Sequence, residues 1–227
     1  MKAWILWTAA LVTVLVLPNV AVSADSATKA YEKGLSCLDK NDVDGAIIAF
    51  TEAIRLKSGF AEAYCDRGFA YLEKHDVDKA IADCTEAIRL DPELAEAYDN
   101  RGNAYEKKSD FDKAVADYTE SIRLDPEEAS PRNSLAWLLA TSSNSRIRDG
   151  KRAVEHAKRA CELSQWKEGD YLDTLAAAYA EVGMFDKAVE FQQKALVMAT
   201  KDTDKEEYRK NLNLYRNSKH WREAKRK

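Results

Sequence analysis

Residues 61–94 read AEAYCDRGFAYLEKHDVDKAIADCTEAIRLDPEL, and residues 95–128 read AEAYDNRGNAYEKKSDFDKAVADYTESIRLDPEE. Both segments are 34 residues long, and they agree at most positions. A third copy, ATKAYEKGLSCLDKNDVDGAIIAFTEAIRLKSGF, occupies residues 27–60. Self-similarity at this period is typical of repeat architectures in which each unit packs only against its neighbours.

Within one unit, the pattern predicts two helices that approach each other closely. Small residues at positions 8, 20 and 27 leave room for such a contact. Ala80, Cys84, Ala87 and Ile88 follow the spacing i, i+4, i+7 and i+8, which places them on one helix face. An Asp-Pro pair ends two of the units, because proline cannot continue a helix and restricts the residue before it. One pair cannot bury its apolar face alone, so we expect the units to stack.

This pattern resembles the tetratricopeptide repeat family from Ala27 to about Asp202. The small residue of the first helix recurs as Gly34, Gly68, Gly102, Ala136 and Ala176. The two small residues of the second helix recur as Ala46 and Ala53, Ala80 and Ala87, Ala114 and Ser121, Ala153 and Ala160, and Ala188 and Ala195.

The resemblance implies an all-α fold, a right-handed α-α superhelix of about five helix pairs with a C-terminal capping helix. The repeat array is expected over residues 25–203. Its predicted repeats are residues 27–60, 61–94, 95–128, 129–168 and 169–202, and residues 204–227 are the predicted capping helix and basic tail.

The fourth repeat is longer than the others, with 40 residues instead of 34, and most of the extra length falls within ATSSNSRIRDGKRA, residues 140–153. One interpretation is a long solvated turn in which Ile147 packs inward and Asp149 starts the next helix. The other is a basic lip for an anionic partner, formed by Arg146, Arg148, Lys151 and Arg152. The surrounding block resembles a variant repeat pair of exported bacterial members of the family, which favours the long turn.

The N-terminus predicts export. Lys2 precedes the apolar run AWILWTAALVTVLVL, residues 3–17, and a Val-Ser-Ala site ends at Ala24. A charged start, an apolar core and small residues at the end are typical of a secretory signal peptide, here residues 1–24 with cleavage after Ala24. An uncleaved membrane anchor is the alternative, although the run is short for a full span and Pro18 interrupts it. The mature protein is therefore expected in the periplasm or the secreted space.

The C-terminal segment predicts a cap for the stack. Tyr208, Leu212 and Tyr215 share a helix face, and Asp204 with Glu207 resembles a capping box. The last twelve residues, RNSKHWREAKRK, are strongly basic. Such a tail is either a frayed solvated end or a contact for an acidic partner or an anionic surface.

No catalytic, metal or cofactor motif is recognisable. The chain has no G-x-S-x-G, no H-E-x-x-H and no glycine-rich phosphate loop. Its three histidines are far apart in sequence, at His75, His156 and His220. Cysteines without a CxxC pair or metal-ligand spacing are interpreted as small buried residues: Cys37, Cys65, Cys84 and Cys161. We therefore expect a protein that is not an enzyme and has no cofactor.

The resemblance also implies a ligand groove lined by the first helix of each repeat. Carried onto this chain, its positions hold Tyr31, Glu62, Asp66, Phe69, Glu73, Glu96, Asp99, Asn100, Asn103, Glu106 and Trp137. In the last repeats they hold Asn133, Asp170, Asp173 and Glu181. One known mode of the family grips a peptide's C-terminal carboxylate with Lys, Asn and Arg. Asn100 keeps one such position, but acids such as Asp66 and Glu96 replace the bases, and an acidic groove repels a carboxylate.

These features predict a non-enzymatic scaffold that binds a protein or peptide with basic groups in the cell envelope or secreted space. Nucleic acid and small-molecule substrates are not expected, and membrane contact is expected only through an uncleaved N-terminal segment. The alternative is a structural or self-associating subunit of an envelope complex.

Overall fold

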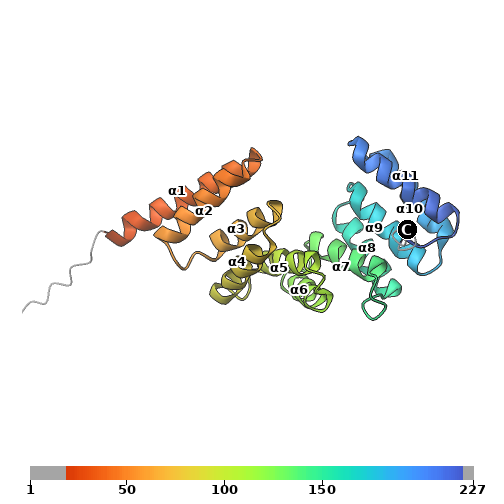
Figure 1. Ribbon diagram of the computed structural model, residues 1–227, viewed down its shortest axis with the longest axis horizontal. Coiled ribbons are helices and arrows are strands. Elements are labelled where there is room, and N and C mark those ends of the chain that lie inside the picture. The colour runs from red at the N-terminus through yellow and green to blue at the C-terminus, as the bar shows by residue number, and fades with distance from the viewer. Residues whose placement is uncertain (1–18, 222–227) are drawn as a thin grey trace, which may run out of the picture.

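The computed structural model describes residues 19–221, with side chains described from Asp25 onward, and within this range the chain forms eleven α-helices and no strand (Figure 1). The helices are α1 (Asn19–Asp39), α2 (Val43–Leu56), α3 (Ala61–Glu73), α4 (Val77–Leu90), α5 (Ala95–Lys107), α6 (Phe111–Leu124), α7 (Ser130–Thr141), α8 (Gly150–Leu163), α9 (Gly169–Glu181), α10 (Phe185–Met198) and α11 (Asp202–Arg216).

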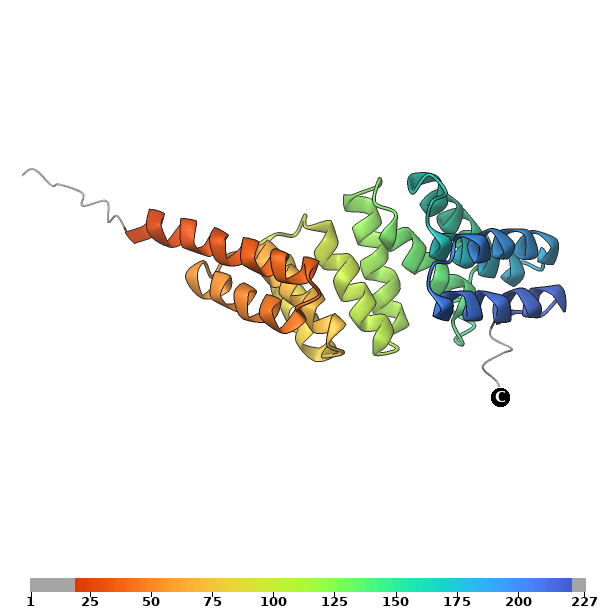
Figure 2. The same cartoon turned by 90° about the horizontal axis from the view of Figure 1, so that it is seen from above.

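The first ten helices form five pairs that follow one another along the long axis of the molecule. Each helix packs on the next in sequence, from α1 with α2 at one end to α9 with α10 at the other (Figures 1 and 2). First helices of neighbouring pairs also touch, as α7 and α9 do. α11 lies against α10 and closes the C-terminal end of the stack. The predicted all-α architecture of five stacked helix pairs and a capping helix is confirmed.

The turn between the two helices has a recurrent geometry in four of the five pairs. The last residue of the turn is the N-cap of the second helix. In the second repeat this residue is Asp76, whose carboxylate accepts a hydrogen bond from the Lys79 backbone N–H at 3.5 Å. The residue before the cap has a positive φ in four of the five pairs: Asn41, His75, Ser109 and Gly183. His75 is thus a turn residue, as its position in the repeat predicts.

Close helix contact explains the small residue at position 8. A Cβ added to Gly34 would lie 2.4 Å from the Phe50 ring, and one added to Gly102 would lie 2.7 Å from the Tyr118 ring. Both rings are fully buried. The first helix therefore has no room for a side chain where the second helix presents an aromatic residue.

Two largely buried ion pairs join the helices of the second and third repeats. Arg67 donates from Nε and Nη2 to the two Asp83 oxygens at 2.7 and 2.8 Å, and Arg101 makes the same two bonds to Asp117. Arg67 Nη1 also donates to Thr51 Oγ1 of the preceding repeat at 3.0 Å. The arginines therefore tie each pair internally and to its neighbour.

The long turn of the fourth repeat is folded into the stack. Ile147 is buried, and Asp149 caps α8 by accepting the Arg152 backbone N–H at 3.1 Å. Arg148 donates from Nη1 to the Ser142 carbonyl at 2.8 Å and from Nε to Glu181 Oε1 of α9 at 3.2 Å. A basic lip that includes Arg148 is therefore wrong, because its guanidinium is used within the molecule.

The C-terminal helix starts earlier than its sequence pattern suggests. Tyr208, Leu212 and Tyr215 are buried against the stack, as predicted. Lys201 occupies the N-cap and the helix begins at Asp202, so Asp204 lies in the first turn and the capping-box interpretation is wrong. An acidic first turn still favours the helix through its dipole.

At the N-terminal end, α1 begins at Asn19, before the first repeat. Residues 1–18, with Lys2, the apolar run and Pro18 of the predicted signal peptide, lie outside the described residues. Between residues 19 and 221, no helix combines the length and apolar character needed to cross a bilayer.

Candidate functional site

The side chains that sequence assigns to the groove come mostly from α3, α5 and α7, which lie next to one another in the stack. Their carboxylates gather on one surface, where several of them interact electrostatically. We call this surface the acidic groove and define it by Glu62, Asp66, Phe69, Glu96, Asp99, Asn103, Glu106, Glu128 and Ser130. Glu128 and Ser130 were not predicted, since they belong to the turn before α7 and its first residue.

The centre of the acidic groove is a depression of about 500 Å³ between α3, α5 and the start of α7. Phe69, 38 % exposed, forms its apolar wall, and Glu96, Asp99, Asn103 and Glu128 supply polar walls. Ser130 Oγ donates to Asp99 Oδ2 at 2.9 Å, which fixes that carboxylate against α7. An apolar wall beside several acids suits a side chain with an apolar stem and a cationic end.

Burial and mutual repulsion act on the carboxylates of the groove. Burial, with a contribution from Glu128, raises the pKa of Asp99 to about 6, although the Ser130 hydrogen bond opposes the rise. Desolvation, together with the charges of Asp66 and Asp99, also raises the pKa of Glu96. Burial and Glu62 raise the pKa of Asp66. Ionised acids that repel one another favour any cation that enters between them.

A second depression, of about 360 Å³, continues the groove toward α7. It is lined by Asn103, Glu106, Lys107, Asn133, Ser134 and Trp137. The Tyr118 hydroxyl lies 2.9 Å from both Asn103 Oδ1 and Glu106 Oε2 and holds these side chains in place. Among the described residues, Asn133 Oδ1 is buried and has no hydrogen-bond partner. This end of the groove therefore offers an indole, a carboxylate and an unused acceptor.

Other predicted groove residues make contacts within the fold or lie outside the two depressions. Asn100 is buried, lines the central depression and donates from Nδ2 to Cys65 Sγ at 3.4 Å. Tyr31 packs between Phe50 and Phe60, with ring centroids 5.7 and 4.8 Å away. Glu73 is exposed at the last residue of α3 and lines neither depression.

The acids predicted for the fifth repeat are engaged by the cap and the long turn. Asp173 is buried, and its Oδ1 accepts from Gln192 Nε2 at 2.6 Å and Asn211 Nδ2 at 3.0 Å. Asp170 accepts the Tyr208 hydroxyl, and Glu181 pairs with Arg148. Asp173 in particular fastens α9 to α10 and α11, so the acidic groove does not extend through it.

One group of side chains within residues 25–221 has donor atoms close enough for a metal ion. The atoms of Cys65, Asp66 and Glu96 lie within 4.8 Å of one another. Sequence spacing did not find this group, because its members come from two helices of different repeats. Burial raises the pKa of the Cys65 thiol far above its usual range, and a metal ligand must lose that proton.

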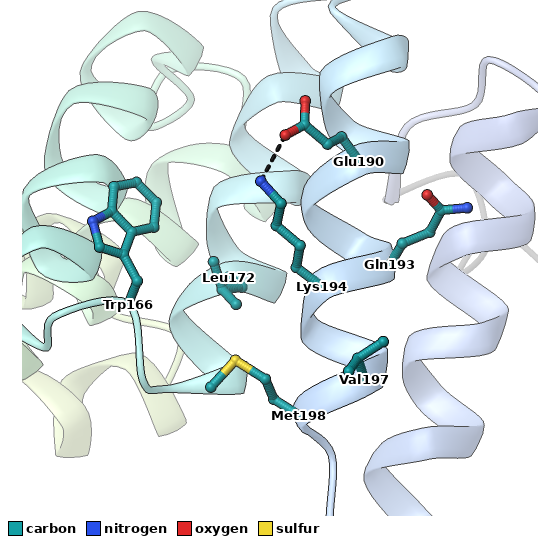
Figure 3. Close-up of a pocket in the computed structure, with 7 residues that line it drawn as sticks. All are labelled: Trp166, Leu172, Glu190, Gln193, Lys194, Val197 and Met198. Atoms are coloured by element: carbon teal, nitrogen blue, oxygen red, sulfur yellow. Dashed lines mark hydrogen bonds and ion pairs between the residues drawn. The ribbon is translucent and has the colours of Figure 1, made fainter.

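An apolar hollow of about 540 Å³ lies on another surface, at the fifth repeat (Figure 3). Leu172, Val197 and Met198 form its floor and edge, Trp166 stands across from α10, and a Glu190–Lys194 ion pair borders it. Val197 is 86 % exposed and Trp166 40 % exposed. The sequence pattern did not predict this surface, because the predicted groove residues lie on the first helix of each repeat and the hollow is built largely on the second helix of the fifth repeat.

The histidines lie on separate elements. His75 is in the turn between α3 and α4, His156 is on α8, and His220 follows α11. The four cysteines are free thiols, and three of them are buried.

Comparison with known proteins identifies the repeat. Residues 61–94 and 95–128 each match the family model described as tetratricopeptide repeat. No curated protein sequence matches the chain.

Solved structures share the fold. A thermophilic tetratricopeptide repeat protein of Thermus thermophilus is 20% identical, with 83% of this chain and 100% of that chain covered and a TM-score of 0.66. The Cut9–Hcn1 hetero-tetramer of the APC/C is 20% identical over 88% of this chain and 39% of that chain, with a TM-score of 0.73. The tetratricopeptide domain of Arabidopsis OM64 is 30% identical over 48% of this chain and 91% of that domain, with a TM-score of 0.48. A chain whose 34-residue units fold as stacked helix pairs, and match this model at two consecutive units, belongs to the tetratricopeptide repeat family.

Proposed function

We propose that this protein is an exported scaffold whose acidic groove binds a protein segment carrying lysine or arginine next to an apolar or aromatic anchor. Tetratricopeptide repeats commonly mediate protein–protein interaction, and members of the family are generally not catalytic. The basic character of the partner and the location are the specific parts of the proposal.

The observation that carries the proposal is the convergence of acids from two successive repeats on one surface. Glu96 and Asp99 of α5 and Glu128 before α7 line a depression of about 500 Å³, and the charge of Asp66 on α3 acts on Glu96. The raised pKa values of Glu96 and Asp99 reflect burial and repulsion by neighbouring acids, which a bound cation would relieve. A peptide carboxylate would add to the repulsion, so capture of a free C-terminus is disfavoured.

The two aromatic residues that border the acids supply the anchor. Phe69 forms one wall of the central depression, and Trp137 lines the next one along the groove. Partly exposed aromatic rings contribute most to recognition when they lie beside polar groups that fix orientation. A segment with a basic and an apolar side chain a few residues apart fits this order.

Titration with paired peptides tests the groove. A labelled peptide with alternating Lys and Leu should bind, and the matched Glu and Leu peptide should not. Glu96→Lys and Asp99→Lys should each weaken the basic peptide at least about tenfold, since each replaces a favourable charge with a repulsive one. Glu155→Lys, an exposed acid on α8 away from the groove, is the matched control and should bind as the wild type does. Equal affinity for both peptides would contradict the proposal.

Export is proposed from the first 24 residues alone. Mass spectrometry of the protein recovered from its native cell should give a mature chain that begins at Asp25. An intact chain that begins at Met1 in a membrane fraction would support the uncleaved anchor instead.

A second candidate is a self-associating structural subunit, favoured by the apolar hollow with Trp166 and Val197. Side chains this exposed are suited to burial against a second copy of the chain. Light-scattering mass at several concentrations separates the two candidates. A monomer throughout favours the peptide-binding scaffold, and a stable oligomer that Val197→Glu dissociates favours the subunit.

A further inference from the structure

The last described residues turn back onto the molecule. After α11 ends at Arg216, Ser218 adopts a φ of 52°, and the Lys219 N–H donates to the Leu214 carbonyl at 3.0 Å. This hydrogen bond reverses the chain direction at the helix end. His220 and Trp221 are consequently partly buried.

The reversed segment contacts helices of the fourth and fifth repeats. The Trp221 ring lies edge-on to Trp137, with centroids 5.1 Å apart and planes at 74°. The His220 ring lies edge-on to Phe185 at 5.5 Å, and its Nδ1 is 3.6 Å from Glu181 Oε2. Residues from α7, α9 and α10 thus receive two consecutive side chains of the tail.

The receiving surface is held in place by the long turn of the fourth repeat. Glu181 contacts His220 through Oε2, while its Oε1 accepts the Nε–H of Arg148. Arg148 in turn bonds the Ser142 carbonyl at the start of the turn. The extra residues between α7 and α8 therefore position a carboxylate against the tail.

Trp137 belongs to the tail contact and to the second depression, which continues the acidic groove. It lines the depression that also contains Asn103 and Glu106, and it packs against Trp221. In sequence, Trp221 is followed by REAKRK, which carries four Lys or Arg and one Glu.

We propose that the segment of residues 217–221 is an intramolecular ligand that covers Trp137 beside the second depression and competes with the partner segment for this indole. This proposal rests on the proposed function and sharpens it. The partner segment presents an aromatic side chain, preferably tryptophan, next to lysine or arginine, and it displaces Trp221 from Trp137.

Tethering makes the competition effective. A segment linked by a few residues has an effective concentration on the order of millimolar at its site. A free peptide that binds the same site with a dissociation constant of about 100 μM is then weakened roughly tenfold. Removing the tethered tryptophan should therefore raise the affinity for the free peptide by the same factor.

The test uses the full chain and a labelled synthetic peptide, KHWREAKRK, which is residues 219–227. Trp221→Ala should bind it about tenfold more tightly than the wild type does. His220→Ala should increase the affinity in the same direction by a smaller factor. Trp166→Ala, which removes a tryptophan at the separate apolar hollow, should leave the affinity unchanged, and Trp137→Ala added to Trp221→Ala should abolish the gain.

Hydrogen exchange of the wild type supplies an independent readout. The amides of residues 217–221 should exchange more slowly in the wild type than in Trp137→Ala. Equal peptide affinity in the wild type and Trp221→Ala, with fast tail exchange in both proteins, would overturn the intramolecular ligand and leave the proposed function standing. If Trp221→Ala binds neither this peptide nor the Lys and Leu peptide, both proposals are overturned.

Discussion

Arg101 shows how one side chain can serve two helices and two repeats at once. It bonds both oxygens of Asp117, and its Nη1 lies 3.4 Å from Thr85 Oγ1 of the preceding repeat. Asp117 is buried, so the pair stands in a medium where an unpaired charge is costly. Removing the guanidinium would leave that carboxylate desolvated without its partner.

We therefore expect Arg101→Ala to lower the free energy of unfolding by about 3 kcal/mol, because it leaves a buried carboxylate unpaired. Chemical denaturation monitored by circular dichroism measures this change. Arg123→Ala is the matched control, since Arg123 pairs with Glu120 on an exposed helix surface. Its loss should leave the free energy of unfolding nearly unchanged, and similar losses for both variants would contradict the role of Arg101.

Asp99 gives the groove a pH dependence. Because burial raises its pKa to about 6, the folded protein without ligand takes up a proton there as the pH falls through that value. A bound cation favours the ionised form. The affinity for a Lys and Leu peptide should therefore be highest above about pH 7 and fall about three- to tenfold by about pH 5.

Asp99→Asn is the control for this titration. It should bind the basic peptide more weakly at about pH 7.5 and show a flatter profile from there down to about pH 5. Isothermal titration at several pH values measures both effects. A wild-type affinity that does not change across this range would exclude Asp99 as the responsible group.

Helices α9, α10 and α11 are joined by a buried polar network around Asp173. Gln192 and Asn211 both donate to one oxygen of this carboxylate, yet burial raises its pKa to about 6. The raised pKa means that the protonated form is the one that folding favours. Its contribution to stability is therefore present at low pH and is lost as the pH rises through about 6.

Asp173→Asn keeps an oxygen acceptor and removes the charge. We expect the variant to be more stable than the wild type at about pH 7.5, by about 2 kcal/mol, and to lose this advantage near about pH 4. Thermal or urea unfolding at the two pH values measures the difference. A variant that is less stable at the higher pH would show that the charged hydrogen bonds outweigh the cost of desolvation.

Helix pairing was predictable from sequence because the residues that determine each helix pair lie within a single repeat. Small residues at positions 8, 20 and 27 and the Asp-Pro endings act within one repeat, so no knowledge of distant contacts is needed. Arg67 and Asp83 escaped notice, since a pair sixteen positions apart follows no helix periodicity. Glu128 entered the groove from a turn, and Trp221 reached Trp137 through a chain reversal. Both depend on tertiary packing that a repeat pattern does not encode.

Along the full stack, the apolar core is distributed unevenly. One continuous cluster of buried residues runs from Ala114 in the third repeat to Tyr215 in α11. The first two repeats contain smaller, separate clusters, such as the one around Ala27 and Phe60. In a linear array, the local packing of each unit sets how readily it opens.

Opening should therefore begin at the N-terminal end. We expect amides of α2 to α4 to exchange faster than those of α7 to α10 under native conditions, and low urea to widen the difference. Hydrogen exchange followed by mass spectrometry resolves the repeats. Uniform exchange across all helices would indicate a single cooperative unit instead.

The positive φ that recurs before the second helix offers a way to measure how strongly neighbouring repeats depend on each other. At this position Gly183 adopts the left-handed conformation freely, whereas His75 and Ser109 adopt it under strain. His75→Gly and Ser109→Gly should each raise the free energy of unfolding by about 0.5–1 kcal/mol. Calorimetry of the double variant compares its gain in free energy of unfolding with the sum of the two single gains. A gain equal to the sum would mean that the two repeats unfold in one transition and that their turns act independently. A gain smaller than the sum would mean that the second repeat unfolds before the third.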